Sequence, residues 1–172
     1  MTTQVLLRWC TRTRPQTGFT LVELLVVLVM AGILAAIAIP TLLSRANAAR
    51  QAEAKTFMGQ LNRAQQAFYA EHHAFAVDFE TLAMQPGQSL YYNYAMAVNQ
   101  SGPDYVTHYA TPKMAQVRAY SGMAGVVYNQ TGDVVSLQTI VCEAQDTAQT
   151  TAPAPQYHDR TLTCVAGTRP LN

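Results

Sequence analysis

Hydrophobic residues are concentrated in one segment near the start of the chain. Between Phe19 and Leu43 the only charged residue is Glu23, and residues 24–39 carry no polar side chain. A helix of about 20 apolar residues is long enough to cross the hydrocarbon core of a membrane. The pattern therefore predicts either a membrane-spanning helix or the apolar region of a secretory signal.

The helical pattern continues beyond this apolar segment. Residues 41–71 contain no proline and a single glycine, and they are rich in good helix formers. Apolar side chains recur every three or four residues along one face, at Phe57, Leu61, Ala64 and Phe68. We therefore predict one helix from Phe19 to about residue 70, bent or locally broken at Pro40, whose second half packs one face against the rest of the protein.

After residue 72 the sequence changes to aromatic and β-branched clusters separated by turn residues. Three strands are predicted, at residues 90–98, 117–128 and 134–142. Residues 129–133 predict a hairpin turn, and residues 144–156 predict a loop. A further loop is predicted between the first two strands, from Gly102, Pro103 and Pro112. A helix followed by strands predicts an α+β fold, with an antiparallel sheet on the apolar face of the helix.

The residues before the apolar segment are basic. Residues 1–18 contain no acid and three arginines, at Arg8, Arg12 and Arg14. A basic start followed by an apolar run is typical of a secretory signal, and residues 36–38 resemble a signal-peptidase site. The length of the run, the position of Glu23 within it and the helical pattern after it all oppose this interpretation. A carboxylate in a membrane span is a candidate functional group that needs a partner, unless it stays at the hydrated headgroup level.

The six residues Gly18-Phe19-Thr20-Leu21-Val22-Glu23 decide between these interpretations. After a basic leader and before an apolar helix, they resemble the class III signal of type IV prepilins and pseudopilins. The resemblance implies the type IV pilin fold, in which a long N-terminal helix packs on an antiparallel sheet. It also implies three segments: a leader at 1–18, a membrane or filament-core half-helix at 19–45, and a head outside the inner membrane at 46–172.

The same resemblance assigns roles to individual residues. A prepilin peptidase would cleave between Gly18 and Phe19 and methylate the new amine of Phe19. In the filament, Glu23 would pair with the Phe19 amine of a neighbouring subunit, since an opposite charge offsets the desolvation of both ions. Pro40 stands where such pilins often carry a helix-kinking proline.

Removal of the leader with Cys10 would leave two cysteines, an even number that could pair. The resemblance implies that Cys142 and Cys164 bound the C-terminal disulfide loop of pilins. A bridge here would stabilise the fold by about 3 kcal/mol on the chain-entropy model, in an oxidising compartment. The head also resembles cyanobacterial pilins, through the segments at residues 91–94, 119–122, 140–144 and 167–171.

Composition and motifs narrow the functional classes. Hydrophobic residues make up 49% of the chain and charged residues 12%, which excludes a disordered tail protein. The net charge is +1, which excludes a strong overall electrostatic field that would attract nucleic acid. The sequence contains no nucleophile, zinc or phosphate-loop motif, so we expect no enzyme, metal or cofactor. Surface positions are expected for all four histidines, His72, His73, His108 and His158.

We therefore predict a structural subunit that polymerises into a type IV pilus serving adhesion, motility or DNA uptake. Its expected partners are other pilin subunits, the prepilin peptidase, the inner membrane and the assembly machinery. A minor pilin or a type II secretion pseudopilin is the alternative within the family. A DNA-binding competence subunit would need a basic cluster, whereas the basic residues of the head are scattered along the sequence: Lys113, Arg118, Arg160 and Arg169. An exported enzyme would instead begin after Ala38.

Overall fold

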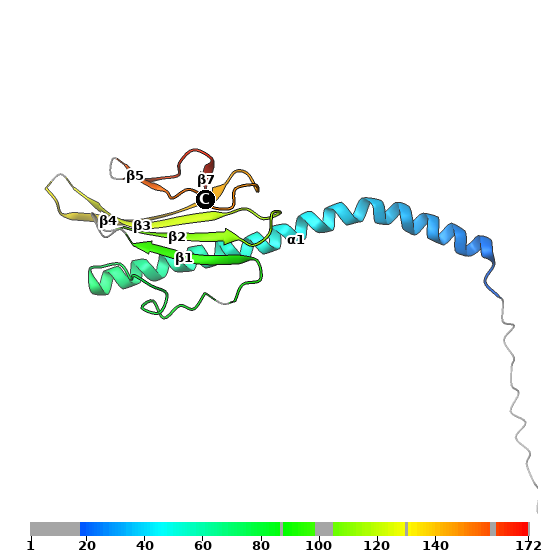
Figure 1. Ribbon diagram of the computed structural model, residues 1–172, viewed down its shortest axis with the longest axis horizontal. Coiled ribbons are helices and arrows are strands. Elements are labelled where there is room, and N and C mark those ends of the chain that lie inside the picture. The colour runs from blue at the N-terminus through cyan, green and yellow to red at the C-terminus, as the bar shows by residue number, and fades with distance from the viewer. Residues whose placement is uncertain (1–17, 87, 99–104, 130, 159–160, 172) are drawn as a thin grey trace, which may run out of the picture. The chain divides into compact units, whose positions relative to one another are not determined.

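The computed structural model describes residues 18–86, 88–98, 105–129, 131–158 and 161–171. One helix precedes seven strands: α1 (Leu21–His72), β1 (Tyr92–Val98), β2 (Tyr105–Pro112), β3 (Tyr120–Tyr128), β4 (Val134–Ala144), β5 (Gln156–His158), β6 (Thr161–Thr163) and β7 (Thr168–Pro170). In Figure 1 the colour follows the chain, from blue at the start of α1 to red near the C-terminus. The predicted α+β class is confirmed. The chain divides into two compact units, one ending at Leu42 and one beginning at Leu43.

A single continuous helix forms the N-terminal part of the described chain. Thr20 caps it, since the backbone N–H of Glu23 donates to Thr20 Oγ1 at 3.2 Å. Thr20 and Glu23 have the spacing of a capping box, which explains why the helix begins at Leu21. Pro40 lies inside the helix, and the expected bend at this residue stays a prediction. The helix ends at His72, and His73 has the left-handed φ of 52° that terminates many helices.

Five of the strands form one antiparallel sheet in the order β1-β2-β3-β4-β7, and β5 and β6 form a separate hairpin. The prediction of a loop between the first two predicted strands was wrong, because β2 (Tyr105–Pro112) lies there. Its aromatic and β-branched residues suit a strand, and Pro112 stands at its end rather than in a loop. Gly102 and Pro103, which also suggested the loop, lie outside the described residues. The short strands β5, β6 and β7 were not predicted.

The second half of α1 packs on the sheet through a face that overlaps the predicted one only at Leu61. The buried residues of the helix are Ala54, Met58, Leu61, Asn62 and Gln65, whereas Phe57, Ala64 and Phe68 are only half-buried. The buried face contains two amides, which a hydrophobic pattern does not detect. Asn62 Nδ2 donates to Ile140 O at 3.2 Å, and Gln65 exchanges two hydrogen bonds of 3.0 Å with the backbone of Ala76.

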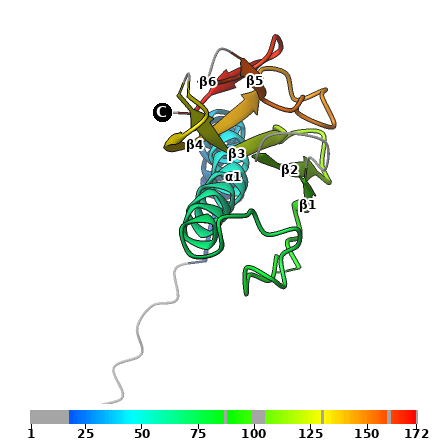
Figure 2. The ribbon, with the colours of Figure 1, turned by 90° about the vertical axis from the view of Figure 1, so that its left-hand side faces the viewer.

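The helix and sheet approach each other closely at Gly122 in β3. A Cβ at this position would lie 3.0 Å from Met58 Cε and 3.4 Å from Ile140 O. The opposite face of the sheet contacts the C-terminal segment, where Ser121 Oγ donates to Pro153 O at 2.7 Å. Figure 2 shows the sheet of the head between α1 and the β5–β6 hairpin. The head is therefore built in layers, with the C-terminal chain covering the face that α1 leaves free.

Candidate functional site

The predicted cleavage and assembly residues lie at the start of α1. Phe19 is 69% exposed, and Glu23 is also exposed in the first turn of the helix. A carboxylate in the first turn is favoured by the positive end of the helix dipole. Gly18 has open space around it, since nothing lies within 4 Å of a Cβ built there. Both sides of the bond between Gly18 and Phe19 are thus accessible, and Glu23 is free to meet another chain.

The first half of α1 presents an apolar surface along its whole length. All residues from Leu21 to Leu43 are exposed, and Glu23 is the only charged residue among them. By length and composition this helix is able to cross a membrane. An apolar surface of this size does not persist in water, because monomeric soluble proteins rarely expose large contiguous apolar patches. The segment therefore needs either lipid or the apolar helices of other chains around it.

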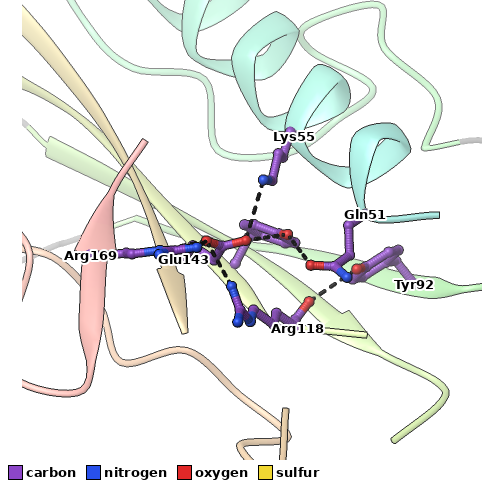
Figure 3. A network of polar contacts seen from close by, with 7 residues as sticks. Gln51, Lys55, Tyr92, Arg118, Glu143 and Arg169 are labelled. Atoms are coloured by element: carbon purple, nitrogen blue, oxygen red, sulfur yellow. Dashed lines mark hydrogen bonds and ion pairs between the residues drawn. The ribbon is translucent and has the colours of Figure 1, made fainter. Parts of the chain in front are cut away.

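A buried carboxylate organises the end of the head near the beginning of β3. Glu143 in β4 is 1% exposed, and Lys55, Arg118 and Arg169 surround it, as Figure 3 shows. Lys55 Nζ lies 3.3 Å from Oε1, Arg118 Nη1 lies 3.3 Å from Oε2, and Arg169 Nη2 lies 2.5 Å from the same oxygen. Because a buried carboxylate is tolerated only with charged or hydrogen-bonding partners, these contacts fix the positions of four separate segments.

Tyrosine hydroxyls extend this Glu143 network toward α1. Tyr120 Oη lies 2.9 Å from Glu143 Oε1 and 3.0 Å from Gln51 Oε1, so its single proton serves one or the other acceptor. Tyr92 Oη donates to Arg118 O at 3.0 Å. Burial raises the pKa of both tyrosines far above the ordinary value, so each stays a neutral hydrogen-bond donor.

Opposing effects act on the pKa of Glu143. Burial raises the pKa, whereas the hydrogen bonds from Arg169 and Tyr120 and the charge of Lys55 lower it. The lowering effects are larger, and the pKa of Glu143 lies below its ordinary value of 4.5. Glu143 is therefore ionised at neutral pH and holds its basic partners as a charged group.

Sequence reasoning missed this network. Arg118 and Arg169 were predicted to be scattered, but the structure brings both to one carboxylate, and Arg160 lies outside the described residues. The members come from positions far apart in the chain, so no local motif contains them. The one available signal was Glu143, an acid at the end of a predicted strand next to a cysteine.

The prediction of surface histidines was wrong for His108. This residue lies in β2, not in a loop, and its side chain is fully buried. Burial lowers the pKa of His108 to about 4, so the ring is neutral at physiological pH. His72 and His73 are exposed at the end of α1, and the side chain of His158 lies outside the described part of the chain.

A disulfide joins Cys142 and Cys164, the pair that the family resemblance implied. It attaches the C-terminal segment to β4 beside Glu143. Within the described ranges, no group of three or more His, Cys, Asp or Glu side chains is placed to hold a metal ion.

Comparison with known proteins places this arrangement in a family. The family model of type IV pilin-like G and H proteins matches residues 51–165, which is more than half of the chain, and the prokaryotic N-terminal methylation motif matches residues 13–39. The type IV major pilin protein PilA of Myxococcus xanthus (strain DK1622) is 36% identical over 80 residues, which cover 46% of this chain and 36% of that protein. The chain thus matches little more than a third of this relative's length. No solved structure matched the chain. The chain is therefore a member of the type IV pilin family, whose proteins are structural rather than enzymatic.

Proposed function

We propose that this pilin is the main structural subunit of a type IV pilus filament. The observation that carries the proposal is the fully exposed apolar half of α1, which begins directly after the Gly18–Glu23 motif. Such a surface suits lipid before assembly and the apolar helices of other subunits after it. The relative from Myxococcus xanthus is named as a major pilin, which supports a main rather than a minor subunit.

The leader at residues 1–18 would be removed before assembly. The match of residues 13–39 to the N-terminal methylation motif supports cleavage between Gly18 and Phe19, followed by methylation of the Phe19 amine. Cleavage at this point leaves the apolar helix on the mature protein, whereas an ordinary signal peptidase would discard it. The subunit would thus wait in the inner membrane as a single-span protein, anchored through residues 19–45.

Polymerisation would then join the N-terminal helices of many subunits. Glu23 and the methylated amine of Phe19 are the two opposite charges available in this apolar segment. Because each ion is poorly solvated among apolar helices, pairing between subunits offsets the desolvation of both. The pair would set the axial register between neighbours, which a continuous apolar surface alone does not specify.

The head at residues 46–172 would form the outer surface of the fibre. Its own core, the Glu143 network and the disulfide keep it folded while the apolar helix moves from lipid to filament. The disulfide requires an oxidising compartment, which supports a head outside the cytoplasm. Adhesion, motility and DNA uptake are all compatible with such a fibre.

The experiment that tests the proposal is the intact mass and N-terminal sequence of the protein in sheared extracellular filaments. We expect an abundant chain that begins at N-methylated Phe19 and is lighter by two hydrogens for the disulfide. A chain that begins near Ile39 would instead identify an ordinary secreted protein. A full-length chain found only in membranes would identify a membrane anchor without a filament.

A further inference from the structure

Basic side chains collect at one end of the head, the unit that begins at Leu43. Seven Lys and Arg residues of this unit lie in the described ranges, and six of them are at that end, whereas Arg63 is not. We call this group the basic end, and it consists of Arg45, Arg50, Lys55, Lys113, Arg118 and Arg169. The chain enters the head at the same end, because Arg45 follows the last residue of the apolar segment by two positions.

Strand boundaries bring half of the basic end together around one residue. Arg118 precedes the first residue of β3, and Arg169 lies in β7 beside the last residues of β4. Both side chains, together with Lys55 of α1, contact Glu143 (Figure 3). Their side chains are 31%, 56% and 41% exposed in that order, so each also presents charge to the surroundings.

The other bases lie next to this group. The guanidinium of Arg50 is 5.1 Å from the centroid of the Tyr91 ring. The backbone N–H of Lys113, just after β2, donates to Tyr91 O at 2.8 Å, and its Nζ donates to Ser89 O at 2.7 Å. Arg45 lies on the preceding turns of α1, and both Arg45 and Lys113 are exposed. The basic end is therefore a continuous part of the head rather than six separate charges.

Acidic residues do not neutralise this surface. Among the described acids of the head, Glu53, Glu143 and Asp146 lie at this end, which leaves three positive charges in excess. Glu143 is buried and lies beneath the basic groups instead of beside them. The other described acids of the head lie farther along α1, in the loop after it, or in the β3–β4 turn: Glu71, Asp78, Glu80 and Asp133.

We propose that the basic end binds anionic phospholipid headgroups while the subunit waits in the membrane. The inference rests on the membrane stage of the proposed function. The end of the apolar segment at Leu43 places Arg45 at the bilayer surface, and headgroup phosphates attract Lys and Arg within a Debye length of about 10 Å. Six long side chains on one surface match a layer of phosphodiesters without the fixed geometry that a single ligand would need. Binding would hold the head against the bilayer until assembly removes the subunit.

The test uses the full chain reconstituted into vesicles of phosphatidylcholine, with or without phosphatidylglycerol. A single fluorescent probe is obtained with Trp9→Phe and Ala115→Trp, because Ala115 is exposed between Lys113 and Arg118. A quencher attached to lipid headgroups reports how close the basic end is to the bilayer. We expect stronger quenching in the anionic vesicles and loss of the difference at high salt.

Two arginines of α1 provide the matched variants. Arg45→Gln removes one charge of the basic end, whereas Arg63→Gln removes the same charge from an exposed position outside it. Arg45→Gln should lower the affinity of the basic end for anionic headgroups about fivefold, and Arg63→Gln should leave this affinity unchanged. Neither residue contacts Glu143, so both variants keep the ion pairs of the Glu143 network.

The outcomes separate this inference from the proposed function. Flotation with vesicles of either composition but equal quenching in both would overturn the inference and leave the membrane stage intact. Failure to float with any vesicle would overturn both. If quenching does not depend on lipid charge but falls on addition of duplex DNA, the basic end binds nucleic acid instead of headgroups. A dependence on protein density in the vesicles, instead of on lipid charge, would assign it to a second copy of the chain.

Discussion

Arg169 and Glu143 join the last strand of the sheet to the strand beside it. Arg169 Nε donates to Glu143 Oε2 at 2.7 Å, and Nη2 lies 2.5 Å from the same oxygen. The neighbouring residue, Cys142, points to the opposite face of β4 and is bonded to Cys164. Two consecutive residues of β4 thus hold the C-terminal segment from both faces of the sheet, one by charge and one covalently.

The first prediction concerns the charge of Glu143. Glu143→Gln keeps the shape of the side chain but leaves Lys55, Arg118 and Arg169 without an anion. We expect the free energy of unfolding to fall by about 2 kcal/mol, as is usual when a charged hydrogen-bond acceptor is lost. This value is below that for a fully buried pair because the basic partners are partly exposed.

Urea unfolding of the protein in detergent micelles, followed by tyrosine fluorescence, measures this change. Glu53→Gln is the matched control, because Glu53 is an exposed acid on the same helix as Lys55. The control should shift the midpoint little. Equal midpoints for the two variants would show that Glu143 does not hold the end of the head together.

The second prediction is a loss of stability in mild acid caused by His108. The pKa of His108 is about 4 in the folded protein and has its ordinary value of 6.5 in the unfolded chain. Between these values the unfolded state binds a proton that the folded state does not, so stability falls as the pH drops from 6.5 toward 4. The total loss is about 3 kcal/mol, and it is complete below the folded-state pKa.

Unfolding measured across this pH range tests the role of His108. His108→Leu should flatten the profile between pH 6.5 and 4.5, because the variant has no group to protonate there. His72→Gln removes an exposed histidine and should leave the profile unchanged. The Glu143 network adds a separate loss at lower pH, since a carboxylate with a lowered folded-state pKa stabilises the fold only while it is ionised. An unchanged slope in His108→Leu would contradict the assignment.

The sequence was most informative where the pattern is long and local. The uninterrupted apolar run and the helix formers after it predicted α1 to within a few residues of its end at His72. The same approach failed for β2, because the nearby prolines were read as a loop, and the error placed His108 on the surface. It also failed for the buried face of α1, where Asn62 and Gln65 replace apolar residues and bond to backbone groups.

The candidate site shows the same limit. The Gly18–Glu23 motif is a run of six adjacent residues, so it is visible in the sequence. The Glu143 network depends on antiparallel register, which places Tyr120 opposite Glu143 and Arg169 on its other side. Such pairing is set by the whole sheet, and no local spacing encodes it.

The third prediction uses the close approach of α1 to the sheet at Gly122. Gly122→Ala places a methyl group 3.0 Å from Met58 Cε and 3.4 Å from a backbone oxygen of β4. Because Met58 is itself fully buried, its terminal methyl group can make room only by moving against its neighbours, and we expect destabilisation by about 1–3 kcal/mol. Gly59→Ala is the matched control on the helix itself, because a Cβ there would lie 3.9 Å from the guanidinium of Arg63, at ordinary contact distance. The control should stabilise the helix by up to about 1 kcal/mol. Thermal unfolding of both variants in the same detergent shows whether they change the stability of the protein in opposite directions.

The last prediction tests the role of Glu23 in assembly. Glu23→Val removes the carboxylate. The backbone N–H of residue 23, which donates to Thr20 Oγ1, stays in place, so the start of α1 is preserved. In the proposed filament the Phe19 amine would then have no opposite charge among the apolar helices, and we expect filaments to be absent or strongly reduced. Cleavage after Gly18 should continue, because the bond lies outside the helix and stays accessible.

Intact mass of the membrane fraction reports cleavage, and the yield of sheared filaments reports assembly. Glu53→Val, which removes an acid from the same helix within the head, is the control and should assemble normally. Normal filaments from Glu23→Val would show that register between subunits is set by the apolar contacts of α1 without the ion pair.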